Sequence, residues 1–186
     1  MPIRLYHTAG PNEVMIITGG PKRTITGPDG ARRQVGYRMK VGGGALVVPW
    51  LESVSILPLD VFSVGLKVER VYTANSVVIS AEGQAQVKVK GDEDSIHRAA
   101  EHFLGKGGEA IQIVTAEVVE GHMRAVLGTR SVEDIIKSQG EMSQEVIAKA
   151  SADLERMGLV LLSYTFKQIT DEEGFITALA EPRIAQ

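Results

Sequence analysis

The sequence predicts an α+β fold in which helices cover one face of an antiparallel sheet. Two adjacent segments, residues 61–73 and 77–91, alternate between apolar and polar side chains, which is typical of half-buried strands. The period changes to that of helices over residues 92–158, and the alternation returns in residues 159–169. Two strands, then helices, then a further strand place the chain in the α+β class.

The first third of the chain is rich in glycine and β-forming residues, so we expect residues 1–58 to form a β-rich N-terminal subdomain. A short strand over residues 13–20 is predicted to end in a glycine pair. Two further strands, separated by three glycines, fill residues 32–50. Pro58 marks the boundary to a second subdomain, residues 59–186, which contains the alternating strands and the helices.

Three helices are expected in that second subdomain. The first begins with acidic residues and ends at Gly105, and the second ends at Gly128. The third begins at Ser131, which forms a capping-box pattern with Asp134, and Gly140 is a candidate break within it. Beyond the break, one face carries the apolar residues Met142, Val146, Ala150, Leu154 and Met157.

The composition is that of an ordinary folded chain and excludes several function classes. Hydrophobic residues make up 44% of the 186 residues and charged residues 23%. The formal net charge of -3 gives no electrostatic reason to expect a nucleic-acid partner. The absence of cysteine excludes disulfides, thiolate metal sites and a cysteine nucleophile, and it favours a reducing compartment. The longest apolar run, residues 45–51, is far shorter than the ~20 residues of a membrane-spanning helix.

Glu120, His122 and Arg124 raise the question of a catalytic group within an apolar helix. On a helical wheel His122 falls on the apolar face, and Glu120 and Arg124 fall on the opposite side as an exposed i,i+4 pair. The other residues of that face are Ile111, Val114, Val118, Ala125 and Val126. A catalytic dyad needs a carboxylate or hydroxyl within hydrogen-bond reach of the imidazole, and this helix has its acids on the other face. We therefore expect a structural histidine at His122 and no catalytic residue.

The sequence contains no motif that indicates a metal, a cofactor or a nucleotide. His97 and His102 are five residues apart on one helix, so they do not form the i,i+4 pair of a zinc helix. The segment GKGGEA, residues 105–110, lacks the glycine spacing and the hydroxyl of a phosphate loop, and no G-x-S-x-G elbow is present. We expect no metal site, no cofactor and no enzymatic activity.

The apolar cluster Val47, Val48, Pro49, Trp50 and Leu51 contains the only tryptophan of the chain. Aromatic rings with a polar edge favour the interfacial layer of a bilayer, so this cluster is a candidate for membrane contact. The alternative is an ordinary core strand, and the residues by themselves leave both alternatives open.

Five segments in one register carry a resemblance to a known family. They are AGPNEVMIITGG (9–20), KVERVYTANSVVISAEGQAQVKVKG (67–91), EHFLGK (101–106), EGHMRAVLGTRSVEDI (120–135) and residues 152–186. Together they resemble the flotillins, a branch of the stomatin/prohibitin/flotillin superfamily, also named SPFH or band 7. Because the resemblance runs nearly end to end, it is far more specific than any single motif.

The resemblance implies an SPFH domain, with a β-rich N-terminal subdomain against the lipid and an α/β subdomain after it. It implies a non-enzymatic scaffold of membrane microdomains that attaches to the cytoplasmic side of the cell membrane and self-assembles into large oligomers. The implied partners are membrane lipids, further copies of the chain, related flotillins and membrane proteins, with no cofactor and no nucleic acid. An alternative within the superfamily is a regulatory adaptor that cages a membrane protease or transporter.

The same resemblance implies that the sequence is the head fragment of a bacterial-type flotillin. Such proteins continue after the region that ends at Gln186 into a coiled-coil stalk, and they place a hydrophobic hairpin before the segment that matches residues 10–13. Pro2 and the lack of cysteine exclude an acyl anchor. We therefore expect a head that is peripheral by itself, while the full-length protein is anchored.

Overall fold

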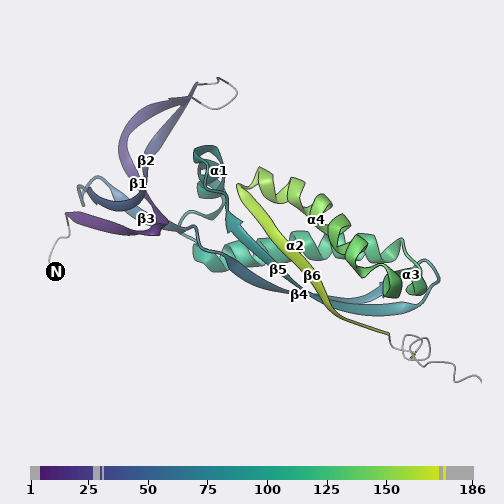
Figure 1. Cartoon of the computed structure of the whole chain (residues 1–186). Coiled ribbons are helices and arrows are strands. Elements are labelled where there is room, and N and C mark those ends of the chain that lie inside the picture. Colours follow the sequence, from purple (N-terminus) through teal and green to yellow (C-terminus); the bar gives the residue numbers. More distant parts are fainter. Residues whose placement is uncertain (1–4, 27–29, 31, 172–173, 175–186) are drawn as a thin grey trace, which may run out of the picture. The chain divides into compact units, whose positions relative to one another are not determined.

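The computed structural model describes residues 5–26, 30, 32–171 and 174 (Figure 1). These residues form two three-stranded antiparallel sheets and four helices, which confirms the predicted α+β class. The chain divides into two compact units. The first unit contains the described residues of Met1–Phe62, Lys88–Ile111 and Glu155–Val160, and the second contains those of Ser63–Val87, Gln112–Leu154 and Leu161–Gln186.

The first sheet has the strand order β2-β1-β3, in which β1 (Tyr6–Thr26) lies between β2 (Arg32–Leu46) and β3 (Ser53–Pro58). Two strand predictions were wrong here. Residues 13–20 belong to a strand of 21 residues, and the three glycines that were expected to separate two strands lie inside β2. β3 lies where the sequence predicted no strand.

Bulges explain why the glycines do not end these strands. The pairing of β1 with β2 slips twice, within residues 9–14 and within residues 18–23 of β1, and at each slip four residues of β1 face one glycine of β2, Gly42 or Gly36. Bulges bend a strand and increase its twist without ending it. Gly42 has a φ of 60°, in the left-handed region that glycine adopts without a steric penalty. Whether a strand ends or forms a bulge at a glycine depends on how it pairs with its partner strand, and the local sequence does not reveal that pairing.

The middle of the central strand is buried on both faces. Val14 and Ile16 lie on one face and Met15 and Ile17 on the other, and none of the four is more than 2% exposed. Met15 and Ile17 form a small core cluster with Ala9 and Val47.

The helix α1 (Glu93–Phe103) belongs to the same unit. Asp92 caps it, because its carboxylate accepts a hydrogen bond of 3.0 Å from the Ser95 N–H. The Tyr37 hydroxyl of β2 lies 2.7 Å from His97 Nδ1 of α1 and so joins sheet and helix. Burial, together with the nearby Glu101 carboxylate, raises the pKa of Tyr37.

The second sheet has the order β4-β5-β6, formed by β4 (Phe62–Tyr72), β5 (Val78–Val89) and β6 (Leu159–Asp171). The predicted alternation is confirmed: in β5 every second residue from Ile79 to Val89 is buried. The long helices α2 (Gly107–Gly128) and α4 (Gln139–Arg156) run along this sheet (Figure 1). The prediction of an antiparallel sheet covered by helices is therefore confirmed.

The short helix α3 (Val132–Lys137) begins as predicted, with Ser131 accepting a hydrogen bond of 3.2 Å from the Asp134 N–H. The predicted break lies at Ser138, two residues before Gly140. The buried residues of α4 are four of the five predicted, namely Met142, Val146, Ala150 and Leu154. None of the helices in the described part of the chain combines the length and the apolar content that crossing a bilayer requires.

Candidate functional site

The candidate membrane-contact residues lie in the turn between β2 and β3. Val47 is buried, with 3% of its surface exposed, and packs with the core of the first sheet. The next four residues, 48–51, are exposed, with exposed fractions of 78% for Trp50 and 71% for Leu51. The stretch thus contains one core residue followed by four residues open to solvent.

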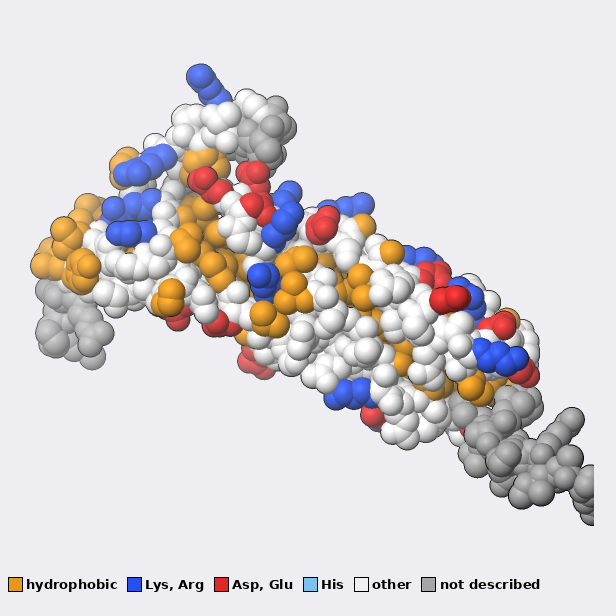
Figure 2. Space-filling model, in the orientation of Figure 1, with side chains coloured by type: hydrophobic (Ala, Val, Ile, Leu, Met, Phe, Trp, Pro, Cys, Tyr) orange, Lys and Arg blue, Asp and Glu red, His pale blue; other side chains and the backbone are white. Residues whose placement is uncertain are grey.

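Three more exposed apolar residues, Leu5, Tyr6 and Leu46, lie beside this turn. Tyr6 pairs with Leu46 in the sheet, and the Leu5 carbonyl accepts a hydrogen bond of 2.8 Å from the Val47 N–H. Figure 2 shows hydrophobic side chains gathered at this end of the first sheet. The apolar corner is defined as Leu5, Tyr6, Leu46, Val48, Trp50 and Leu51. Sequence reasoning missed Leu5 and Tyr6 because strand pairing, and not sequence proximity, brings them to the turn. It also left out Leu46, which directly precedes Val47.

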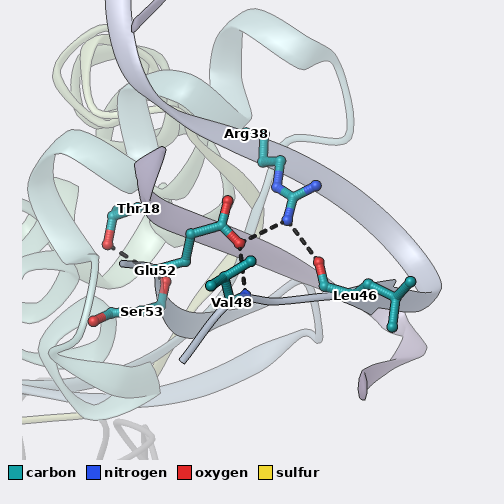
Figure 3. Close-up of polar contacts among 6 residues, drawn as sticks. All are labelled: Thr18, Arg38, Leu46, Val48, Glu52 and Ser53. Carbon is teal, nitrogen blue, oxygen red and sulfur yellow. Dashed lines mark hydrogen bonds and ion pairs between the residues drawn. The ribbon is translucent and has the colours of Figure 1, made fainter. Parts of the chain in front are cut away.

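A network of hydrogen bonds holds the turn in one conformation (Figure 3). The Glu52 carboxylate accepts one hydrogen bond of 3.0 Å from the Val48 N–H and another of 3.0 Å from Arg38 Nη2. The same Nη2 donates to the Leu46 carbonyl at 2.7 Å, and the Val48 carbonyl accepts from the N–H groups of Leu51 and Glu52. Because both ends of the turn are tied to Arg38, the exposed side chains of the turn project from a fixed backbone.

Gly19 of β1 provides the space that this turn needs. It has a φ of 97°, and a Cβ at this position would lie 2.1 Å from the carbonyl oxygen of Leu51. Real Cβ atoms essentially never approach a backbone oxygen so closely, so a side chain at residue 19 would displace the turn. The glycine pair that was predicted to end a strand instead allows close contact between β1 and the turn.

The buried face of α2 differs from the predicted one, and the predicted structural histidine, His122, lies at its edge. The buried residues of α2 are Ile111, Thr115, Val119, Met123, Val126 and Leu127. The predicted apolar face was therefore displaced by about one residue, or ~100°, and the assignment of Ala125 to it was wrong because Ala125 is exposed. His122 is half-buried, and its Nε2 lies 2.9 Å from Asp153 Oδ2 of α4. A helical wheel of α2 alone could not show this carboxylate, because it comes from another helix.

Glu120 and Arg124 contact a strand instead of pairing with each other as predicted. Glu120 Oε1 accepts a hydrogen bond of 2.9 Å from the Lys67 N–H, and Arg124 Nη1 donates one of 3.3 Å to the Glu69 carbonyl. Both contacts satisfy backbone groups along β4, an edge strand of the second sheet. Glu120, His122 and Arg124 therefore have separate structural contacts and do not converge on one point.

The polar face of the second sheet carries a shallow hollow lined by Lys67, Glu69, Ser80, Glu82, Gln168 and Thr170. Lys67 Nζ lies 2.8 Å from Glu69 Oε1. The hydrogen bond to Glu69 raises the pKa of Lys67, and the one from Lys67 lowers the pKa of Glu69. Both groups are thus held in their charged forms, whereas a general acid or base needs a pKa near the working pH. Among the residues that the structure describes, no three His, Asp or Glu side chains lie close enough to hold a metal ion.

Comparison with known proteins identifies a family along almost the whole chain. The model of the SPFH domain / Band 7 family matches residues 7–186. The flotillin-like protein FloT of Bacillus subtilis (strain 168) is 39% identical over 188 residues, which cover 99% of this chain and 36% of that protein. Flotillin-1 of Homo sapiens is 33% identical over 183 residues, which cover 98% of this chain and 40% of that protein. The chain therefore spans well under half the length of these relatives.

Proposed function

Because the chain belongs to the SPFH domain / Band 7 family, we propose that it is a non-enzymatic scaffold of membrane microdomains. The apolar corner is the observation that carries this proposal. Leu46, Trp50 and Leu51 are each at least 70% exposed, on a backbone that the Arg38–Glu52 ion pair holds in place. Apolar residues gathered at one exposed place mark an interaction surface, and tryptophan favours the membrane interface.

In this proposal the apolar corner inserts into the interfacial layer of the cytoplasmic leaflet. Fully burying a Leu or a Phe side chain is worth about 1.5–3 kcal/mol, so a few such residues give weak and reversible attachment. Self-assembly into large oligomers would multiply these weak contacts into stable attachment. The partners of the chain would thus be membrane lipids, further copies of itself, related flotillins and membrane proteins.

We also propose the division into subdomains of residues 1–58 and 59–186, with the lipid contact in the first. The name flotillin of the two relatives supports this assignment, since the family resemblance associates the N-terminal subdomain with lipid. His122 has a structural role in this proposal, because its partner Asp153 joins α2 to α4. The proposal includes no metal, cofactor or catalytic residue.

Co-flotation with phosphatidylcholine liposomes tests the proposal. We expect Trp50→Ser with Leu51→Ser to abolish flotation, because the substitutions remove the two most exposed side chains of the apolar corner. The matched control is Ile113→Ser with Leu162→Ser, which removes two exposed apolar side chains of the second unit. Circular dichroism confirms that both variants are folded. Equal flotation of the parent and the Trp50 variant would refute membrane contact through this corner.

A further inference from the structure

A small hollow opens in the first sheet at the second bulge of β1. It is lined by Gly20, Pro21 and Arg23 from β1 and by Gly36, Tyr37 and Arg38 from β2, and its cavity volume is about 40 Å³. Gly36 is the single residue of β2 that faces the bulge. Because two lining residues are glycines, the hollow gives a small ligand access to the backbone.

Two guanidinium groups line this hollow. Arg23 is exposed and makes no ion pair with any residue that the structure describes. Arg38 uses Nη2 for Glu52 and the Leu46 carbonyl, while its Nε is buried without an acceptor in the described part of the chain. Glu52 also lines the hollow and balances one of the two charges, so a net positive charge remains. Guanidinium groups match phosphate oxygens in both charge and geometry.

Arg38 connects the hollow to the apolar corner. Its Nη2 holds the Leu46 carbonyl and the Glu52 carboxylate that fixes Val48, and both Leu46 and Val48 belong to the corner. An anion in the hollow would therefore lie beside exposed apolar side chains. The charge of the chain is also uneven, since residues 1–62 contain seven Lys and Arg against four Asp and Glu, and the remainder contains 13 against 19.

We infer that this hollow binds the phosphate of an anionic phospholipid whose apolar part contacts the apolar corner. The inference rests on the proposed function and adds the class of lipid to it. The hollow is too small for acyl chains, so the charged and apolar parts of the lipid would occupy adjacent places. The cytoplasmic leaflet attracts basic segments because it carries anionic lipids.

Partitioning onto two kinds of vesicle tests this inference. One vesicle contains phosphatidylcholine alone, and the other contains phosphatidylcholine with phosphatidylglycerol. We expect Arg23→Gln to lower partitioning onto the anionic vesicle about fivefold and to lower partitioning onto the neutral vesicle much less, because the choline ammonium of phosphatidylcholine neutralises its phosphate. The matched control is Arg32→Gln, which removes an equal charge from the same sheet at a position outside the hollow. It should lower anionic partitioning by about twofold or less, as expected for a screened long-range charge.

The outcomes separate the phosphate site from the proposed function. Equal losses in the two variants, or a loss of Arg23→Gln partitioning that is as large on neutral vesicles as on anionic vesicles, would overturn the phosphate site alone. A further outcome is that the protein binds inorganic phosphate in the absence of vesicles. If the same phosphate concentration also abolishes the difference in anionic partitioning between the two variants, the lipid would be overturned as the source of the phosphate. Absence of parent binding to either vesicle would overturn both proposals, because both vesicles offer an interfacial layer to the apolar corner.

Discussion

The exposure of Trp50 depends on a few residues that fix the backbone of its turn. Glu52 ties the start of the turn to Arg38, and Gly19 lets the β1 backbone approach the Leu51 carbonyl. At the scale of single residues, polar and glycine positions therefore determine how an apolar surface is presented.

Gly19→Ala should destabilise the protein strongly. The new Cβ would meet the Leu51 carbonyl, and the φ of 97° is strained for alanine, so we expect the free energy of unfolding to fall by about 2 kcal/mol or more. Urea denaturation followed by tryptophan fluorescence measures this loss. Gly36→Ala is the matched control in the same sheet, because a Cβ there meets nothing within 4 Å. Similar losses in the two variants would contradict the close approach at residue 19.

At the scale of elements, α2 protects the edge of the second sheet. Strand edges with unpaired N–H and C=O groups promote association with other chains. Glu120 and Arg124 supply an acceptor and a donor to two such groups of β4. The two charged residues that looked like a surface ion pair in the sequence therefore cover the backbone of an edge strand.

Glu120→Ala should weaken this protection. We expect the free energy of unfolding to fall by about 1 kcal/mol, with an increase in association at high protein concentration because the Lys67 N–H becomes free to pair with another chain. Thermal denaturation and light scattering measure the two effects. Glu117→Ala removes an exposed acid from the same helix and should change neither, whereas Glu120→Gln keeps an acceptor and should restore most of the stability. If the Glu117 variant were as unstable as the Glu120 variant, the loss of stability would come from removing a negative charge from α2 and not from losing the contact with the Lys67 N–H.

Local sequence predicts those helices and strands that bury only one face, because the periodicity of their apolar residues reveals that face. β4, β5, α1 and α4 were predicted on this basis, since one face of each is covered and the other is open. The middle of β1 gives no such signal because both of its faces are buried there, and the glycines of β1 look the same in a bulge as in a turn. The partner of His122 and the full extent of the apolar corner depend on residues distant in sequence, so no local pattern could reveal them.

At the scale of the whole molecule, the first unit is assembled from separate parts of the chain. Its sheet lies within Met1–Phe62, but Lys88–Ile111 and Glu155–Val160 belong to the same unit. The Tyr37–His97 hydrogen bond joins β2 to α1, and a Cβ on Gly158 would lie 2.0 Å from the Ser95 carbonyl, so these segments are closely packed. The core cluster on one face of the sheet is small, with Met15, Ile17, Ala9 and Val47.

This arrangement predicts that residues 1–58 do not fold independently. The core of a chain of this length rarely supplies more than about 3–5 kcal/mol, and the fragment lacks α1 and the segment around Gly158 that pack in the same unit. We expect circular dichroism to show no cooperative thermal transition for the fragment and a clear one for the intact chain. Tyr37→Phe in the intact chain is the control, because it removes only the hydroxyl at His97 and should cost about 1 kcal/mol while the fold remains. A sharp transition of the fragment at the temperature of the intact chain would show that the first sheet is stable without these segments, and that its lipid contact can be studied in isolation.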